Sequence, residues 1–240
     1  MWLAWSEPVD LYLGRSVAML KVGSAAPVMM EIPVTTSPLD ATLSSLTALA
    51  GRDIAKGKLR VFLSGALCPA LGVSTPKEIT QWKERHQIAL ASVAQTLSTD
   101  TNQVECGIDA FLPGVAAAIS LATLEQLRLW AIKSHYSIVS IQPLWALATQ
   151  CQAARQPGIK SLVLLEPDAV TLLASDELNR FTASTLPGQI DPSLLGTHTR
   201  RWQVSHGLTE DQVMKIGFDI KPGNVVPAYP KPWSSHWYKP

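Results

Sequence analysis

The same order of secondary structure is expected twice along this chain. In each place an apolar strand breaks at a short turn and runs back, and a third strand, a helix and a fourth strand follow. The first copy covers residues 10–64 and the second covers residues 161–218. Because each copy combines three strands, a helix and a fourth strand, we expect an α/β protein with mixed sheets, built as two related lobes.

The boundaries of the expected elements follow from the apolar periodicity and the turn residues. In the first copy we expect strands over 10–20 (with a turn) and 28–33, a helix over 39–50 and a strand over 59–64. In the second copy we expect strands over 161–173 (with a turn) and 180–185, a helix over 192–204 and a strand over 212–218. Between the copies we expect a helix of about 20 residues that begins at Thr75 and Pro76, a hairpin over 103–121, a helix over 124–133, a strand over 136–141 and a helix over 144–154.

The run Gln156-Pro-Gly158 predicts a break between two lobes. We therefore expect a first lobe over residues 1–157, with an inserted helix and hairpin at 66–121, and a second, shorter lobe over 158–220. The last segment, 221–240, contains five prolines and cannot continue a helix or a central strand. It is either a strap held on the domain or a recognition arm for a partner, and its aromatic anchors in both cases are Tyr229, Trp233, Trp237 and Tyr238.

Composition narrows the classes of partner. The net charge is +1 and no block of like charges occurs, so we expect neither nucleic acid nor anionic lipid as a ligand. Charged residues make up only 16% of the chain, which favours a surface made for protein contact. Three widely spaced cysteines indicate reduced thiols in a cytosol, and no run of 18 or more apolar residues predicts a membrane span.

Familiar catalytic and metal-binding motifs find little support in the sequence. The segment 51–58 has five residues between its glycines, and Leu59 stands where a phosphate-binding loop needs Ser or Thr. The five histidines have no partner at metal-ligand spacing, so we expect no metal site. Trp82, Trp130 and Trp145 lie at apolar helical positions, which predicts that they fill the core.

Two stretches together carry a resemblance to a known superfamily. The first is the duplicated unit. The second is the strand, proline and small-residue helix of Ile141-Gln-Pro-Leu-Trp-Ala-Leu-Ala148, which precedes the first hairpin of the second copy, Leu162-Val-Leu-Leu-Glu-Pro-Asp-Ala-Val170. In this order of elements the chain resembles the actin-like ATPase superfamily over roughly residues 9–219. Within it, the chain resembles PilM-like proteins and GspL-type cytoplasmic domains, which are scaffolds of type IV pilus and type II secretion assemblies. The resemblance implies a two-lobed, duplicated ribonuclease H-like fold.

The same resemblance indicates which residues should hold a nucleotide, and the chain departs from it in both turns. Gly14 is present, but the expected aspartate two residues earlier falls on Tyr12. In the second turn the expected aspartate-hydrophobe-glycine falls on Leu165-Glu166-Pro167, where proline also removes a backbone N–H. Asp10, Glu166 and Asp168 remain near the turns as potential oxygen ligands for magnesium.

We therefore expect a pseudo-ATPase with no catalytic residue and no resident cofactor. ATP with magnesium is the one cofactor to test. The expected function is a non-catalytic cytoplasmic scaffold of a pilus or secretion apparatus, peripheral to the inner membrane, that binds proteins of that assembly. The alternative from the enzyme class is a divergent ATP-binding protein or small-molecule kinase of the same superfamily. A homodimer is an option that the sequence leaves open.

Overall fold

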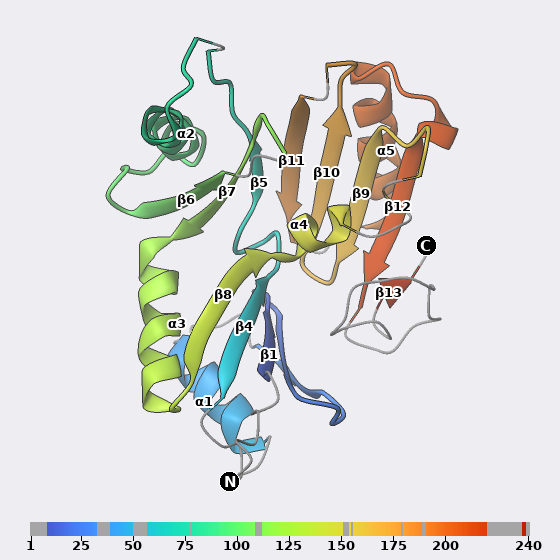
Figure 1. The fold of residues 1–240 in the computed structure, drawn as a ribbon. Coiled ribbons are helices and arrows are strands. Elements are labelled where there is room, and N and C mark those ends of the chain that lie inside the picture. Colours follow the sequence, from blue (N-terminus) through green and yellow to red (C-terminus); the bar gives the residue numbers. More distant parts are fainter. Residues whose placement is uncertain are drawn as a thin grey trace, which may run out of the picture.

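A computed structural model describes ten stretches of the chain. They are residues 9–32, 39–49, 57–76, 78–108, 112–150, 154, 156–178, 180–188, 191–219 and 237–238. Figure 1 shows two lobes, one below and one at the upper right, with a smaller sheet and a helix at the upper left.

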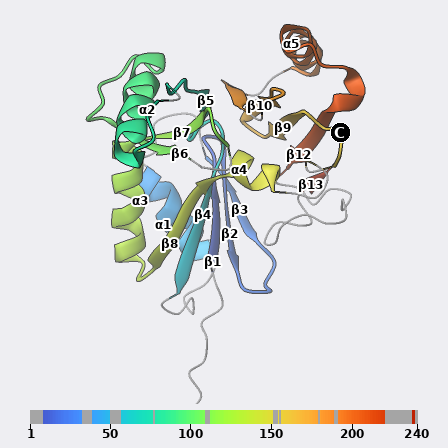
Figure 2. The same ribbon diagram turned by 45° about the horizontal axis from the view of Figure 1, so that its top comes forward.

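The first lobe is built on a five-stranded sheet with the order β3-β2-β1-β4-β8. Its strands are β1 (Val9–Leu13), β2 (Val17–Val22), β3 (Val28–Glu31), β4 (Lys58–Leu63) and β8 (Ser137–Pro143). β1 is antiparallel to β2 and parallel to β4, and β8 is parallel to β4. Helices α1 (Leu39–Leu49) and α3 (Leu121–Lys133) lie side by side on one face of this sheet (Figures 1 and 2). β8 leads directly into the short helix α4 (Leu144–Thr149) between the lobes.

The second lobe repeats this plan in the order β11-β10-β9-β12-β13. Its strands are β9 (Ser161–Glu166), β10 (Ala169–Ser175), β11 (Phe181–Pro187), β12 (Val213–Phe218) and β13 (Trp237–Tyr238). The helix α5 (Pro192–Ser205) covers one face through Leu195 and Trp202, and a 3₁₀ turn, η1 (Glu210–Gln212), precedes β12. The first four strands match those of the first lobe in order and direction. The predicted duplication and the mixed α/β class are confirmed.

A third sheet, in the order β5-β7-β6, occupies the insert of the first lobe with helix α2 (Trp82–Thr96) against it. Its strands are β5 (Ala70–Gly72), β6 (Val104–Ile108) and β7 (Val115–Ser120). β6 and β7 form the expected hairpin, but β5 is not predicted by the sequence patterns. β5 has only three residues, too few for alternation to distinguish it from a loop.

The start of α2 also differs from the sequence expectation. The helix begins at Trp82 rather than at Thr75, because Ile79 donates its N–H to Pro76 in a separate turn and Gln81 is extended. Trp82 is consequently 56% exposed, so its assignment to the core is wrong. Trp130 and Trp145 are buried as predicted.

The alternation of side chains along the central strands creates two cores in the first lobe. Leu11 and Leu13 of β1 face helices α1 and α3, while Tyr12 faces the opposite way. On that opposite side Tyr12 joins a core that also contains Leu164 and Phe218 of the second lobe. The two lobes therefore share buried apolar surface, and the two hairpin turns meet beside it.

Candidate functional site at the junction of the two hairpin turns

The turn between β1 and β2 presents two consecutive backbone donors to the second lobe. Gly14 donates its N–H to the carbonyl of Val17 (2.8 Å), which closes the turn. The next two N–H groups, those of Arg15 and Ser16, both donate to Asp168 across the lobe junction. Consecutive N–H groups in a tight turn form a concavity that binds anions. The first turn is therefore a donor surface.

The turn between β9 and β10 supplies the acceptor. One carboxylate oxygen of Asp168 accepts the N–H of Arg15 and that of Ser16, the latter at 3.2 Å. The other oxygen accepts the hydroxyl of Ser64 at 2.5 Å. The backbone carbonyl of Asp168 is held by the N–H of Gly188 at 2.7 Å. Asp168 is 3% exposed and Ser64 is fully buried. The desolvated carboxylate therefore accepts hydrogen bonds from three donors of the first lobe.

Glu166 makes a second acidic contact across the same junction. Its two carboxyl oxygens accept the N–H of Gly65 at 3.0 Å and the hydroxyl of Tyr12 at 3.3 Å. Burial raises the pKa of Glu166 to about 8, and the negative charge of Asp168 acts in the same direction. Burial likewise raises the pKa of Tyr12 well above its usual value, and Glu166 and Asp168 add to the rise. The buried site therefore favours the neutral form of Glu166.

Two glycines make these contacts sterically feasible. A Cβ atom on Gly14 would lie 2.5 Å from a carboxylate oxygen of Asp168. A Cβ atom on Gly65 would lie 2.7 Å from the hydroxyl of Thr171 and 3.1 Å from a carboxyl oxygen of Glu166. Glycine is thus favoured at both positions, because a Cβ atom there would collide with side chains of the second lobe.

The predicted site residues divide into those at the junction and those away from it. Tyr12, Gly14 and Glu166 meet there, and Pro167 lies in the acidic turn, where it has no N–H to donate. Leu165 does not take part, because it packs on the opposite face of its sheet. The acidic position of the second turn is thus Glu166.

The third candidate magnesium ligand, Asp10, also lies outside this network. Its carboxylate pairs with the guanidinium of Arg60, at 2.6 and 2.9 Å. Ser64 and Gly65 carry no sequence motif that marks them as residues of this site. Strand alternation does place Glu166 at the site, since Leu162, Leu164 and Glu166 share the face that points between the lobes.

The residues at the junction do not fit a bound nucleotide phosphate. The N–H groups of Arg15, Ser16 and Gly65 donate to Asp168 and Glu166, so they are not available to phosphate oxygens in this structure. The space above Gly14 is filled by the Asp168 carboxylate. Among the described residues, no group of three or more His, Cys, Asp or Glu side chains is placed to hold a metal ion.

The C-terminal tail reaches this region through one aromatic side chain. β13 pairs antiparallel with β12, and Trp237 is fully buried. Its ring lies 5.1 Å from that of Phe218, which in turn lies 4.7 Å from the ring of Tyr12. Trp237 is therefore part of the interlobe core and not an exposed anchor for a partner. Tyr229 and Trp233 lie outside the described residues, as does the side chain of Tyr238.

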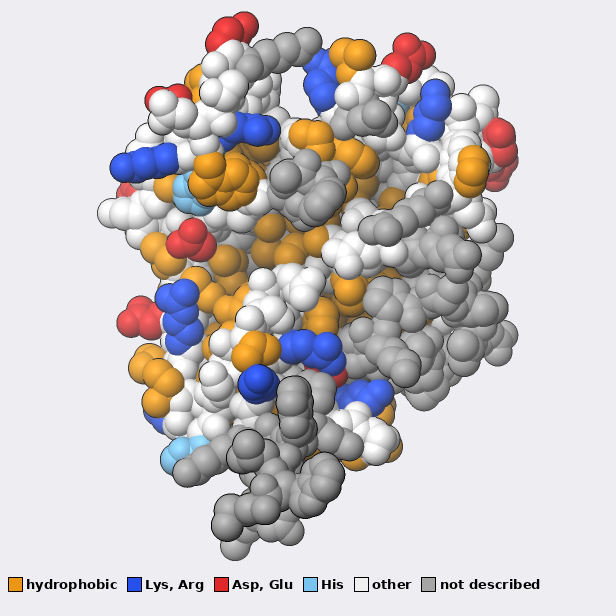
Figure 3. Space-filling model, viewed as in Figure 1, with side chains coloured by type: hydrophobic (Ala, Val, Ile, Leu, Met, Phe, Trp, Pro, Cys, Tyr) orange, Lys and Arg blue, Asp and Glu red, His pale blue; other side chains and the backbone are white. Residues whose placement is uncertain are grey.

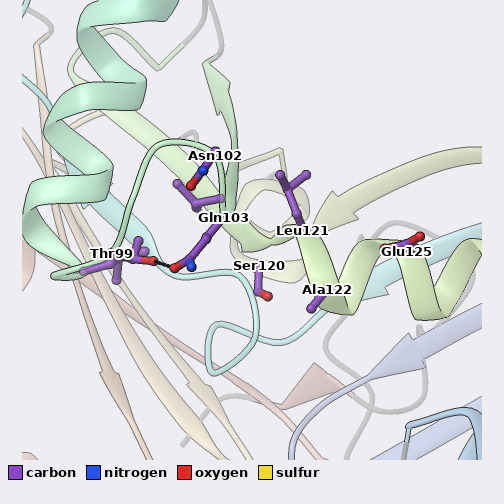
Figure 4. Close-up of a pocket in the computed structure, with 9 residues that line it drawn as sticks. Thr99, Asn102, Gln103, Ser120, Leu121, Ala122 and Glu125 are labelled. Carbon is purple, nitrogen blue, oxygen red and sulfur yellow. Dashed lines mark hydrogen bonds between the residues drawn. The ribbon is translucent and has the colours of Figure 1, made fainter.

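A groove of about 570 Å³ opens elsewhere, between the end of α2 and the start of α3. In Figure 4, Thr99, Asn102 and Gln103 on the loop before β6 face Ser120, Leu121 and Ala122 at the start of α3, and Gln103 accepts the hydroxyl of Thr99. The groove is also lined by Leu97, Val104 and Glu125.

An apolar stripe continues from this groove along α3. Ala122 and Glu125 line the groove, and Leu129 and Ile132 follow them at helical spacing. Leu129 is 50% and Ile132 70% exposed. Leu97, at the rim of the groove, is 40% exposed. On the face seen in Figure 3, exposed hydrophobic side chains lie among charged ones.

Solved structures share the fold of this chain. A Bacteroides thetaiotaomicron protein, described as having an actin-like ATPase fold and unknown function, aligns with a TM-score of 0.59 at 8% identity, over 88% of this chain and 81% of that one. The chain has an actin-like fold. The cytoplasmic domain of EpsL, an inner membrane component of the type II secretion system of Vibrio cholerae, aligns with a TM-score of 0.56 at 10% identity, over 93% of this chain and 87% of that one.

A third similar structure is the PilM–PilN type IV pilus biogenesis complex, with a TM-score of 0.52 at 13% identity, over 85% of this chain and 67% of that one. The superfamily resemblance of the sequence is thus confirmed at the level of the fold. No protein-family model and no curated protein matches the chain. In the described part of the chain, no helix is long and apolar enough to cross a bilayer.

Proposed function

We propose that the chain is a non-catalytic scaffold of a membrane-associated pilus or secretion assembly, located in the cytoplasm at the inner membrane. The main support is the junction of the two turns, where Asp168 and Glu166 take up backbone donors that a nucleotide phosphate would need. The EpsL and PilM–PilN structures, whose names place them in such assemblies, have the same fold. The proposed partner is another protein of the assembly.

The groove at the start of α3 is the proposed binding surface. Its volume of about 570 Å³ lies within the range of sites that hold small ligands or short peptide segments. The stripe formed by Leu129 and Ile132 extends it along the helix, so that a helical segment with apolar side chains every three or four residues fits the surface. The side chains of the loop at 99–103 supply polar contacts at one end.

The decisive experiment is a titration of the chain with peptides that tile the cytoplasmic segments of the membrane proteins encoded beside its gene. We expect one peptide to bind with a micromolar dissociation constant and Ile132→Glu to weaken it at least about tenfold, equivalent to about 1.4 kcal/mol. Leu178→Glu is the matched control, because Leu178 is 65% exposed and lies on the second lobe. Equal weakening by both variants would remove the groove from the proposal.

The absence of nucleotide chemistry is tested separately. ATP with magnesium at 100 times a dissociation constant would stabilise a binding protein by about 2.7 kcal/mol. We expect no change of melting temperature at millimolar ATP. A clear increase, together with the failure of every peptide to bind, would favour the divergent ATP-binding alternative instead.

A further inference from the structure

The lobe junction contains an anion and the site that binds it within one chain. The site consists of the N–H groups of Arg15 and Ser16 and the hydroxyl of Ser64, and the anion is the carboxylate of Asp168. Ser64 is itself held in place, because its oxygen accepts the N–H of Ala66 at 3.0 Å. Each donor comes from the first lobe and the acceptor comes from the second.

We propose that this is a genuine oxyanion-binding site whose resident ligand is the chain's own Asp168, so that an internal carboxylate joins the lobes where a bound anion would otherwise be needed. The site selects an anion with at least two oxygens, since the two backbone N–H groups converge on one oxygen and Ser64 binds the other. Carboxylate and phosphate both meet this requirement.

The glycine at the turn provides independent geometric support. A Cβ atom on Gly14 would lie 2.5 Å from the Asp168 oxygen and 3.2 Å from its carboxyl carbon. The φ angle of Gly14 is not in the left-handed region, where glycine would be needed for the backbone itself. Glycine at position 14 therefore leaves room for the anion, which occupies the space where a Cβ atom would lie.

A consequence concerns how the two lobes are held together. In this chain the anion is covalently attached, so its effective concentration at the site does not depend on a soluble ligand. The relative placement of the lobes is then constant, whatever the nucleotide or phosphate level. The proposal stands apart from the partner-binding function, and its test uses no partner.

The test is to remove the internal anion and offer inorganic phosphate in its place. Asp168→Ala should lower the melting temperature, and phosphate should raise it again by about 5 °C at roughly 20 times its dissociation constant. Wild type should not respond to phosphate. The double variant Gly14→Ala with Asp168→Ala should lose the phosphate response, because the new methyl group fills the position of the bound oxygen.

Asp176→Ala controls for the loss of any acidic side chain, since Asp176 is an exposed residue of the same lobe. A folded Asp168→Ala protein that responds to phosphate no more than wild type would overturn the proposal. Equal phosphate responses of all variants would also overturn it, because they would indicate an adventitious ion only. If Asp168→Ala does not fold even in phosphate, Asp168→Asn decides: it keeps the shape without the charge, and stability equal to wild type would overturn the proposal.

Discussion

The two hairpin turns occupy equivalent places in the duplicated halves but have opposite chemistry. The first turn offers backbone N–H groups from Arg15 and Ser16 and has Gly14 where a side chain would obstruct an anion. The second turn has no N–H at Pro167 and places an acid on each side of it, Glu166 and Asp168. Duplication of one unit has thus produced a donor half and an acceptor half. Two such halves bind each other directly, whereas two donor halves would need an anion between them.

The largest effect expected from this asymmetry is the pH dependence of stability due to Glu166. Its pKa rises from an ordinary 4.5 to about 8 in the folded protein. The contribution of its neutral form is therefore complete below pH 4.5 and is lost as the pH rises through about 8. We expect the free energy of unfolding to fall by up to about 1.4 kcal/mol per pH unit in that window, and Glu166→Gln to abolish this slope.

Urea unfolding between pH 5 and 9 measures the slope. The groups that face Glu166 are Tyr12 on β1, Ser64 and the Gly65 N–H after β4, and Asp168 on its own turn. Glu177→Gln is the control, because Glu177 is an exposed glutamate of the same lobe. An unchanged slope in Glu166→Gln would show that Glu166 does not enter the folded state neutral.

The fifth strands of the two sheets give the next largest effect. β8 has seven residues and is parallel to its neighbour, whereas the described part of β13 has two residues and is antiparallel. The small strand is anchored by Trp237, which is fully buried against Phe218. We expect Trp237→Ala to destabilise by about 3–5 kcal/mol.

Trp82→Ala is the matched control for this prediction. Trp82 is 56% exposed, so we expect a loss below about 1 kcal/mol. Chemical denaturation with a secondary-structure probe measures both variants. Similar small losses in the two would mean that the end of the chain contributes little to the second lobe.

Sequence patterns predicted the duplicated architecture because alternation and turn residues are repeated in both halves. The superfamily resemblance placed the acidic position of the second turn on Leu165, which packs on the opposite face of its sheet. Strand periodicity would have corrected it by placing Glu166 with Leu162 and Leu164. The pairing of Asp168 with Ser64 could not be predicted, because the two residues are 104 positions apart and meet only when the lobes dock.

Adding a methyl group to the donor turn should have an intermediate effect. We expect Gly14→Ala to destabilise by about 1–3 kcal/mol, because the methyl group overlaps the Asp168 carboxylate. Combined with Asp168→Gly, the Gly14→Ala change should cost much less than it does alone, and a double-mutant cycle measures this coupling. Gly196→Ala, in the open part of α5 with nothing within 4 Å, should be neutral or stabilising. If the losses in the free energy of unfolding were additive for the two changes, Gly14 and Asp168 would not be coupled.

The smallest expected effect distinguishes polar contact from packing at Tyr12. Tyr12→Phe keeps the ring beside Phe218 and removes only the hydroxyl that donates to Glu166 at 3.3 Å. We expect a loss of about 0.5–1.5 kcal/mol at neutral pH. Because the Tyr12 hydrogen bond lowers the pKa of Glu166, its removal should also move the pH-dependent fall of stability to higher pH. Unfolding curves recorded from pH 6 to 10 test both parts, and a shift to lower pH would show that the hydroxyl instead favours neutral Glu166. Tyr12 would then stabilise the junction through the neutral form of Glu166 rather than through its carboxylate.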